Sequence, residues 1–383
     1  MKYNKRVAIA LGAGYTPGIN SIILGVAISA YKAGWEVVGI HDGFEGLLFP
    51  EKYPNNGLID LSPEAIGKLN PMSSDAMGTS ASIDPFNVRV VNEWDMVEEV
   101  DMSDTLLDNL KKEKIDAVIA IMMGRGLSIL HKLNLKGLQS VCIPRTVEND
   151  MAATSVAFGF NTTLSFTIEM LDRAKQSAIS SKKIGIVEVL GSQSGWLALQ
   201  SSIAVLADAV IIPEYPCDVK ALAKYLKTKI SPARPHALVV IAEGGSFTNL
   251  TETVKDTTSS LQKALSPSAT EDNSGFVINK SGKAAKTLAQ ELQGLLAEEV
   301  YPLVLGPWAR GGEATAIDRQ LGLAYGAATV KAVEENKFAT MAAFVPPHID
   351  FVPLIDTLNK KRTIQSDNEF MKVAHALGIY TGI

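Results

Sequence analysis

The amino-acid sequence predicts a two-lobed α/β protein in which each lobe is a mostly parallel sheet flanked by helices. Short apolar runs of strand length alternate with segments of helical periodicity along most of the 383 residues. Strands that alternate with helices form parallel sheets covered on both faces. The chain is also too long for one small core and long enough for two lobes of ordinary size.

The first series of elements opens with a complete strand–helix–strand unit. An apolar strand at 5–11 enters a glycine-rich loop, and Pro17 suits the first turn of a helix at 19–33. A second strand follows at 36–40. The same alternation predicts a helix near 104–113, a strand at 117–121, a helix near 127–133 and a strand at 140–143.

A second series of elements predicts the second lobe. Its members are a long helix near 161–179, a strand at 184–190, a helix near 195–206, strands at 209–212 and 237–242, and helices near 283–299 and 315–336. Residues 246–275 are rich in Ser and Thr and have little periodicity, which predicts a surface insertion. Residues 340–383 are expected to form a closing strand and a tail.

The composition excludes several classes of partner. The 36 Lys and Arg residues against 41 Asp and Glu give a net charge of −5, which offers no general attraction to nucleic acid or to an acidic membrane. No apolar run approaches the ~18 residues that a membrane helix needs. The short apolar run at the N-terminus fits a first strand better than a signal peptide. We expect a protein without nucleic-acid or membrane partners.

The cysteines and histidines predict neither a disulfide framework nor a metal site. Cys142 and Cys217 lie far apart, and no C-x-x-C motif occurs. The five histidines are scattered without metal-binding spacing. Two isolated cysteines fit a reducing compartment, so we expect a cytoplasmic location.

The segment Pro-Arg-Thr-Val-Glu-Asn-Asp at residues 144–150 carries the densest chemistry in the chain. It follows an apolar strand and places the carboxylates of Glu148 and Asp150 beside the Thr146 hydroxyl and the charge of Arg145. Ligands of open α/β sheets bind outside the carboxyl ends of the strands. We expect Arg145 to bind an anion, and the other three side chains to contact hydroxyls or accept a proton. An ordinary acidic loop is the alternative.

Two glycine-rich turns between a strand and a helix are candidate anion sites. The first contains Gly14 and Tyr15, and the second contains Gly124 and Arg125. Backbone N–H groups and the helix dipole can bind a phosphate at such a turn. A simple tight turn is the alternative for the first, and a solvated arginine on a glycine turn is the alternative for the second.

A competing interpretation concerns Asp42. This residue ends the second strand, where a ribose-binding carboxylate would lie in a nicotinamide-dependent dehydrogenase. The first glycine-rich turn fits that interpretation as well.

Three later segments place further candidates near strand ends. Gly191 follows the strand at 184–190, Glu243 follows the strand at 237–242, and Arg310 lies between tight turns. Each segment is as easily a simple turn. Their order and spacing along the chain are more informative than any one of them.

Taken in order, these segments resemble the phosphofructokinase family of the ATP- or pyrophosphate-dependent kind over nearly the whole chain. The family motifs and the similar segments are G-G-D-A-P-G-M-N with 13–20, G-I-x-x-G with 39–43, P-G-T-I-D-N-D or P-K-T-I-D-N-D with 144–150, V-E-V-M-G-R with 187–192, and Q-R-G-G-x-P…D-R with 309–319. The tail at 361–378 resembles pyrophosphate-type bacterial members.

The resemblance implies the two-lobed phosphofructokinase fold with ligands between the lobes. The donor-side lobe is expected over 1–159 and about 309–345, and the sugar-phosphate-side lobe over 160–308 and about 346–383. A homo-oligomer, dimer or tetramer, is also implied, in which Lys183 reaches a neighbour's site.

The resemblance also gives each matching residue a role. The implied residues are Glu148, Asp150 and Thr146 for catalysis; Gly14, Tyr15, Gly124, Arg125 and Arg145 for the donor or another anion; and Lys183, Leu190, Gly191, Glu243, Tyr301 and Arg310 for the sugar phosphate. ATP or pyrophosphate is the implied co-substrate, and Mg²⁺ is the implied cofactor.

Departures from the family pattern fall mainly on the donor side. The family's G-G-D-G or G-G-D-D, whose Asp organises magnesium, matches residues 123–126, which contain no carboxylate. Tyr15 stands in place of the Asp of the opening motif, and Glu148 in place of the proton-accepting Asp. We therefore expect the usual metal ligand to be missing and the base to be one methylene too long.

The sugar-phosphate side is altered as well. Of four family positions that carry basic side chains, Lys183 and Arg310 keep a cation, whereas Tyr301 and Pro307 do not. Ser192 replaces the Arg of V-E-V-M-G-R. The sugar pocket is expected to be partly preserved and partly re-tuned.

Two functions follow from these observations. The first is phosphoryl transfer from ATP or pyrophosphate to fructose 6-phosphate or a related sugar phosphate, weakened or lost. The second is an inactive paralogue that acts as a sugar-phosphate or anion sensor or as a regulatory subunit. For either function we hypothesise that Arg125 and Arg145 bind phosphate or pyrophosphate directly, without metal.

Overall fold

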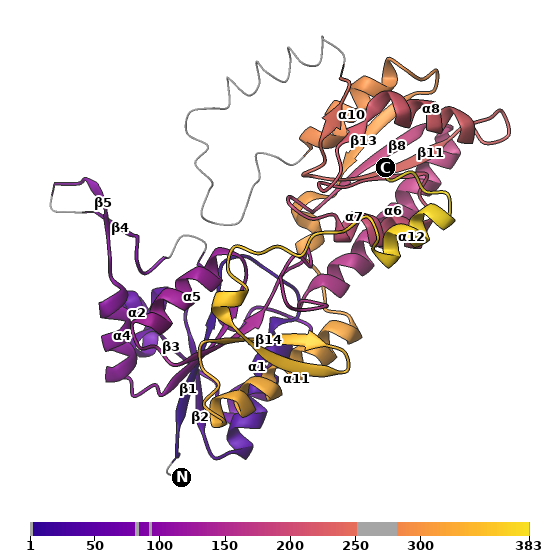
Figure 1. Ribbon diagram of the computed structural model, residues 1–383. Coiled ribbons are helices and arrows are strands. Elements are labelled where there is room, and N and C mark those ends of the chain that lie inside the picture. The colour runs from indigo at the N-terminus through magenta and orange to yellow at the C-terminus, as the bar shows by residue number, and fades with distance from the viewer. Residues whose placement is uncertain (1–2, 81–83, 92–93, 251–281, 383) are drawn as a thin grey trace.

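The computed structural model describes residues 3–80, 84–91, 94–250 and 282–382 and shows two lobes along an elongated molecule (Figure 1). Each lobe has its own sheet with helices on both faces, and most neighbouring strands in the two main sheets run parallel. The predicted fold class is therefore confirmed. Within the described ranges, no helix combines the length and apolar character needed to cross a membrane.

The first lobe contains a seven-stranded sheet in the order β15-β14-β7-β6-β1-β2-β3. Strands from β14 to β2 run parallel, and β15 and β3 are antiparallel edges. The strands are β1 (Arg6–Leu11), β2 (Glu36–Ile40), β3 (Leu58–Asp60), β6 (Ala117–Met122), β7 (Ser140–Pro144), β14 (Thr340–Val345) and β15 (His348–Pro353). A hairpin of β4 (Val88–Val91) and β5 (Val97–Val100) projects from this lobe (Figure 1).

Alternate side chains of the central strand β1 pack into two cores. Val7 and Ile9 belong to the core with α1 and α11, and Ala8 and Ala10 to the core with α4 and α5. This alternation explains the unbroken apolar run, because both faces of a parallel strand are buried. The helical elements of the lobe are α1 (Ile19–Lys32), α2 (Glu45–Leu48), η1 (Pro50–Lys52), η2 (Pro54–Gly57), α3 (Pro63–Ile66), α4 (Ser103–Lys112), α5 (Arg125–Leu135), α11 (Ala316–Glu334) and η5 (Leu354–Asp356).

The second lobe contains a four-stranded parallel sheet in the order β13-β8-β11-β9. One face packs against α6 and α7, and the other against α8 and α10. The elements are α6 (Phe160–Ser181), β8 (Ile184–Val189), α7 (Trp196–Val205), β9 (Ala209–Ile211), α8 (Val219–Lys229), β11 (Ala237–Ala242), α10 (Lys283–Gln293), β13 (Val300–Val304), η4 (Gly306–Arg310) and α12 (Glu369–Ala376), with a short pair of β10 (Cys217–Asp218) and β12 (Phe247–Thr248).

Helix α6 connects the lobes, and a buried carboxylate from α11 fixes its first turn. Asp318 accepts hydrogen bonds from the N–H groups of Gly159 and Thr162 at 3.3 and 2.6 Å, and from the Thr162 hydroxyl at 2.6 Å. A carboxylate stabilises the positive end of a helix and satisfies its unpaired N–H groups. The Asp-Arg pair of the family motif at 318–319 therefore includes a structural cap in this protein.

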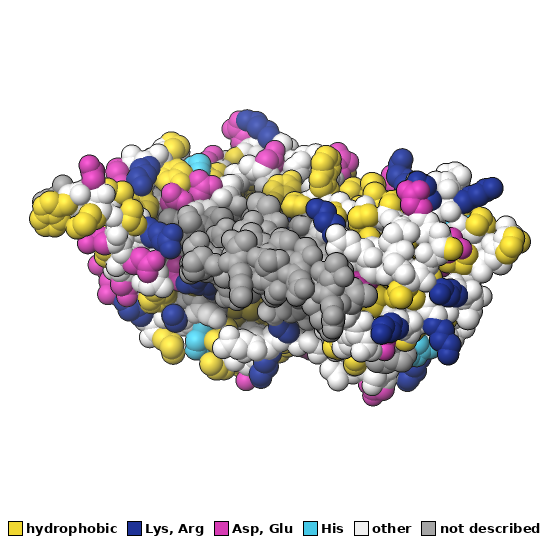
Figure 2. All heavy atoms as spheres, turned by 90° about the horizontal axis from the view of Figure 1, so that it is seen from above, with side chains coloured by type: hydrophobic (Ala, Val, Ile, Leu, Met, Phe, Trp, Pro, Cys, Tyr) yellow, Lys and Arg dark blue, Asp and Glu magenta, His cyan; other side chains and the backbone are white. Residues whose placement is uncertain are grey.

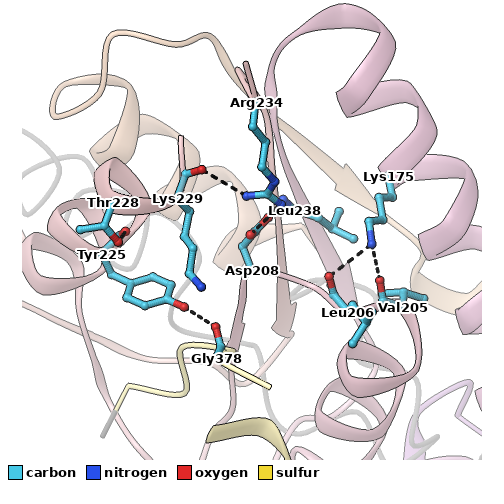
Figure 3. Close-up of polar contacts among 10 residues, drawn as sticks. All are labelled: Lys175, Val205, Leu206, Asp208, Tyr225, Thr228, Lys229, Arg234, Leu238 and Gly378. Carbon is cyan, nitrogen blue, oxygen red and sulfur yellow. Dashed lines mark hydrogen bonds and ion pairs between the residues drawn. The ribbon is translucent and has the colours of Figure 1, made fainter. Parts of the chain in front are cut away.

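The end of the C-terminal tail is anchored in the second lobe. Figure 3 shows the Tyr225 hydroxyl on α8 donating to the carbonyl of Gly378. In the same view, Arg234 pairs with Asp208 at 2.8 Å, and Asp208 also accepts from the backbone N–H at the start of β11. Lys175 donates to carbonyls at the C-terminus of α7, where a cation complements the helix dipole. These cations are thus engaged by protein groups.

Several elements differ from the sequence expectation. Strand β15 lies in the first sheet, so the predicted boundary near residue 346 falls too early. The helix expected over 283–299 ends at Gln293 and is followed by β13, an edge strand whose Pro302 weakens the strand pattern. Most of the predicted insertion at 246–275 lies outside the described residues. The rest of the lobe division stays a prediction.

Candidate active site

The loop after β7 meets the carboxyl ends of strands from the second sheet. Glu148 Oε2 accepts a hydrogen bond from the N–H of Ser192, just after β8, at 3.1 Å. The guanidinium of Arg310, at the end of η4, lies 3.6 Å from Glu148 Oε1. The Arg310 and Glu148 side chains are 13% and 12% exposed. The structure thus brings these two predicted site residues together at the junction of the lobes.

A local hydrogen-bonded turn orders the two carboxylates of this loop. The Thr146 hydroxyl donates to Asp150 Oδ1 at 3.0 Å and accepts the N–H of Glu148 at 3.1 Å. Asn149 has a left-handed backbone with φ 54°, a conformation in which Asn is enriched. A Thr hydroxyl can bond the backbone two residues on, and Asn tolerates the left-handed conformation. The sequence order Thr-x-Glu-Asn-Asp therefore sets the shape of the loop.

Two carboxyl groups at this junction have raised pKa values. Burial raises the pKa of Glu148, and the nearby charge of Asp150 raises it further, while Arg310 opposes the rise. Burial also raises the pKa of Glu243, which follows β11, to about 7, with added repulsion from Glu148 and Glu188. A carboxyl group whose pKa approaches neutrality is better suited to proton transfer at physiological pH.

The raised pKa of Glu243 predicts that stability falls as pH rises. The folded protein binds more protons than the unfolded chain between the ordinary value of 4.5 and the folded value of about 7. Over that window we expect the free energy of unfolding to drop by on the order of 1–2 kcal/mol, after allowance for partial exposure. Thermal melts near pH 5 and pH 8 should show a larger loss of Tm in the wild type than in E243Q. Equal losses in the two proteins would contradict this prediction.

Gly191 shapes the same junction, whereas Leu190 belongs to the core. Gly191 has φ 140°, and a Cβ there would lie 2.6 Å from the carbonyl oxygen of Ser194. Its own carbonyl accepts from the N–H of Gly244 at 3.0 Å, which ties the end of β8 to the end of β11. Leu190 is 5% exposed and packs in the apolar cluster of α6 and α7. Its side chain is therefore part of this core, and the sugar-phosphate contact of Leu190 stays a prediction.

Arg145 has a different role from the predicted anion ligand. Its side chain is fully buried, and its guanidinium donates to the carbonyls of Gly12 at 3.0 Å and of Ala13 and Gly14. Burial lowers the pKa of Arg145 to about 10, and the charge of Arg310 contributes. The guanidinium is directed at the backbone of the opening loop, because three successive carbonyls converge on it. We therefore correct the prediction: Arg145 braces this loop.

The two donor-side loops lie next to each other at the carboxyl ends of β1 and β6. A Cβ at Gly14 would lie 3.9 Å from the Met123 sulfur, and Gly14 and Gly124 both have positive φ. Tyr15 is 40% exposed. Arg125 begins α5 and forms an ion pair with Asp84 at 2.8 Å. Arg125 therefore already has a carboxylate partner at the predicted anion site.

Lys183 and Tyr301 lie at the other edge of the second sheet. Lys183 precedes β8 and pairs with Glu299 at 2.6 Å. Tyr301 is near the start of β13, opposite Gly185. Glu148 contacts the chain after the carboxyl end of β8, so these two residues are separated from it by the length of the strand. Within one chain, the structure does not bring them to the site.

Asp42 offers no support for a nucleotide-ribose site. Its carboxylate accepts from the Tyr53 hydroxyl at 3.0 Å. A Cβ on Gly78 would lie 2.1 Å from Asp42 Oδ1, so the carboxylate is closely packed against that glycine. Asp42 is therefore already held between Tyr53 and Gly78.

Magnesium, which the resemblance implies, finds no ligand cluster in the described part of the chain. No group there of three or more His, Cys, Asp or Glu side chains could hold a metal ion. Asp150 has one carboxylate oxygen engaged by the Thr146 hydroxyl and the other by the Lys361 ammonium. Both carboxylate oxygens of Asp150 therefore have protein partners, and the loss of the usual magnesium ligand stays a prediction.

Lys361 is a site residue that the sequence prediction missed. Its ammonium forms an ion pair with Asp150 Oδ2. The available signal was a basic run, Lys-Lys-Arg at 360–362. The sequence gives no indication of the partner of this run, because Asp150 lies 211 residues away.

Comparisons with known proteins agree with this architecture. The phosphofructokinase family model matches residues 6–333. ATP-dependent 6-phosphofructokinase 2 of Clostridium perfringens is 30% identical over 377 residues, which cover 98% of both chains. ATP-dependent 6-phosphofructokinase 3 of Streptomyces coelicolor is 31% identical, over 94% of this chain and 96% of its own.

A solved structure shows the same fold at lower identity. The pyrophosphate-dependent phosphofructokinase of Marinobacter aquaeolei superposes with a TM-score of 0.73 at 18% identity, over 98% of this chain and 92% of that one. The family match spans most of the chain, and the relatives match it almost end to end. The protein therefore belongs to the phosphofructokinase family.

Proposed function

We propose that this protein transfers a phosphoryl group from ATP to a hydroxyl of fructose 6-phosphate or a related sugar phosphate. Family membership supports sugar-phosphate phosphoryl transfer at the level of the family. The observation that carries the proposal for this chain is the position of Glu148, a largely buried carboxylate with a raised pKa where the two lobes meet. The names of the relatives, which are ATP-dependent enzymes, favour ATP as the donor.

In this mechanism Glu148 is the general base. The attacking hydroxyl oxygen bonds to the terminal phosphorus of ATP, its proton passes to Glu148, and the bond between that phosphorus and the leaving ADP oxygen breaks. The Ser192 N–H and Arg310 hold the carboxylate in place. Arg310 also supplies positive charge near the reacting groups, where phosphoryl transfer needs it.

The acceptor sugar is held by the remaining polar groups of the junction. Thr146 and Asp150 orient the acceptor, because their hydrogen bond fixes both side chains on the loop that carries Glu148. Glu243 is placed to bind a sugar hydroxyl, since its N–H donates to the Val189 carbonyl at the end of β8 at 2.9 Å, near the Ser192 N–H that contacts Glu148. Precise placement of such groups accounts for much of the rate of an enzyme.

A sensor without turnover is the second candidate, and one observation favours it. The two arginines expected to bind the donor anion both contact protein groups: Arg145 binds loop carbonyls and Arg125 binds Asp84. Arg145 is therefore not directed at an anion, as the hypothesis of a metal-free anion site requires. In the sensor proposal the sugar phosphate binds at the Glu148 junction and stabilises the protein without reacting.

Turnover and ligand-induced stabilisation separate the two candidates. Purified protein would be assayed with fructose 6-phosphate and either ATP or pyrophosphate, with and without magnesium, and melted with each compound alone. We expect ATP consumption that depends on fructose 6-phosphate and yields one bisphosphate per ADP. Turnover with pyrophosphate but not with ATP would show that pyrophosphate, and not ATP, is the phosphoryl donor. A rise in Tm with fructose 6-phosphate but no turnover would favour the sensor, and neither response would reject both.

We also propose a homo-oligomer in which Lys183 serves a neighbouring subunit. Lys183 is one-third exposed and lies at the edge of the sheet opposite to its own Glu148 junction. Sedimentation of the wild type should give a dimer or a tetramer. Mixed oligomers of K183M and E148Q subunits should regain turnover that neither variant has alone. An active monomer would contradict this arrangement.

A further inference from the structure

The chain after η5 forms a strap between the lobes, defined here as residues 359–364. On the side of the first lobe, Lys361 forms a β-bridge with Met151, and the N–H of Arg362 donates to the carbonyl of Asp150 at 2.9 Å. Figure 1 shows this part of the tail running from the first lobe toward α12, which packs on α7. The strap therefore lies directly against the loop that carries Glu148.

The other side of the strap is fixed to the second lobe. The indole N–H of Trp196, at the start of α7, donates to the carbonyl of Arg362 at 2.7 Å, and the Arg362 guanidinium lies 3.8 Å from the centre of the Trp196 ring. The N–H of Ile364 donates to Glu214 at 3.0 Å. Glu214 also accepts from the N–H of Gly195 at 3.1 Å. The position of the strap is thus set by groups from both lobes.

Within this strap, Lys361 directs its ammonium to Asp150 Oδ2, while the Thr146 hydroxyl donates to Oδ1. The Asp150 side chain is 9% exposed and that of Lys361 is 39% exposed. Each oxygen of the Asp150 carboxylate therefore has a partner, and the two partners together restrict rotation of the side chain. Removal of either partner would leave a nearly buried carboxylate with one oxygen unpaired, and the side chain could then rotate.

We propose that Lys361 is a positioning residue for phosphoryl transfer, one that holds Asp150 in its productive orientation and balances the negative charge of the junction. This inference rests on the proposed function. Glu148 is influenced there by the charge of Asp150 and in turn influences Glu243, and Arg310 supplies positive charge 3.6 Å from Glu148. Lys361 is the contribution of the tail to this balance, and its charge also opposes the rise in the pKa of Glu148.

The test compares K361M, K361R and the control K360M, whose side chain is exposed and next in sequence. We expect K361M to lower kcat by about 10–100-fold with a much smaller change in KM, and to move the acidic limb of the kcat–pH profile to higher pH. K361R, which keeps the charge, should lower kcat several-fold and leave that limb in place. K360M should match the wild type. Wild-type kcat in K361M, or in the neutral variant K361Q where K361M fails to fold, overturns the proposal.

A double variant shows whether Lys361 acts through Asp150. K361M/D150N should be no slower than D150N alone, because the positioned group is already lost. Fully multiplicative losses overturn the proposal. If the wild type shows no turnover, the same cycle is measured by calorimetric titration of fructose 6-phosphate. A weaker affinity in K361M than in K360M, absent in the D150N background, then supports the positioning role even though transfer has failed, and equal affinities reject it.

Discussion

Replacing Glu148 by Gln is expected to lower kcat by about 10²–10⁴-fold, the range for loss of a general base. The amide keeps the size of the side chain but cannot accept the proton of the attacking hydroxyl. Its carbonyl oxygen can still accept from the Ser192 N–H, which Glu148 meets at 3.1 Å, so the fold and the affinity for fructose 6-phosphate should change little. Steady-state kinetics, with calorimetric titration of the sugar phosphate, check both parts.

A matched control and a shortened variant sharpen this prediction. E64Q changes an exposed glutamate on α3 and should keep wild-type kcat. E148D shortens the side chain by one methylene, which withdraws the carboxylate from the Ser192 N–H and from Arg310; we expect a loss of about 10²-fold. Wild-type turnover in E148Q would exclude Glu148 as the base. A gain of turnover in E148D would instead show that the longer side chain misplaces the carboxylate.

Replacing Arg145 by Met is expected to reduce the free energy of unfolding by about 3–5 kcal/mol. The fully buried guanidinium donates to the carbonyls of three successive residues, Gly12, Ala13 and Gly14. Methionine fills part of the space but cannot donate to those carbonyls, two of which belong to the buried residues Gly12 and Gly14. Urea unfolding followed by circular dichroism measures the change.

An exposed arginine provides the comparison for Arg145. R173A removes a side chain that is 69% exposed and pairs with Glu169 one helical turn away, so it should cost less than about 1 kcal/mol. R145M unfolding at the wild-type urea midpoint would contradict the bracing role. A normal midpoint together with lost pyrophosphate binding would restore Arg145 as an anion ligand.

Much of the fold could be predicted because the spacing of the apolar residues distinguishes helices from buried strands. Val7 to Leu11 read as a buried strand, and both faces of β1 are covered. Elements with a weak pattern were missed: β13 contains Pro302 on a sheet edge, and β3 has three residues. The pairing of β15 with β14 is set by the tertiary fold, and no local sequence pattern indicates it.

The positions of the candidate site residues could be inferred from the sequence where they follow strand ends, but not where distant partners decide them. Glu243 and Arg310 follow the carboxyl ends of β11 and β13 in the second sheet, and the loop after β7 of the first sheet brings Glu148 to the same junction. Lys183 precedes its strand, so strand direction alone would have assigned it to the opposite edge.

Long-range partners account for the remaining errors. The carbonyls that hold Arg145 come from a loop about 130 residues earlier, and the lysine on Asp150 comes 211 residues later. A sequence shows that a charge is present, but its partner is fixed only by the tertiary fold.

The placement of β14 between β7 and β15 has a consequence for the order of biosynthesis. The first sheet receives its strands from residues 6–144 and then from residues 340–353, after the sheet of the second lobe has been translated. Until then, the outer edge of β7 has no neighbour from this sheet, and the face of α1 that receives α11 has no cover from that helix. A nascent chain must therefore keep an open apolar edge in solution while more than half of the protein is made, and demand for chaperones during translation should be greatest in that interval.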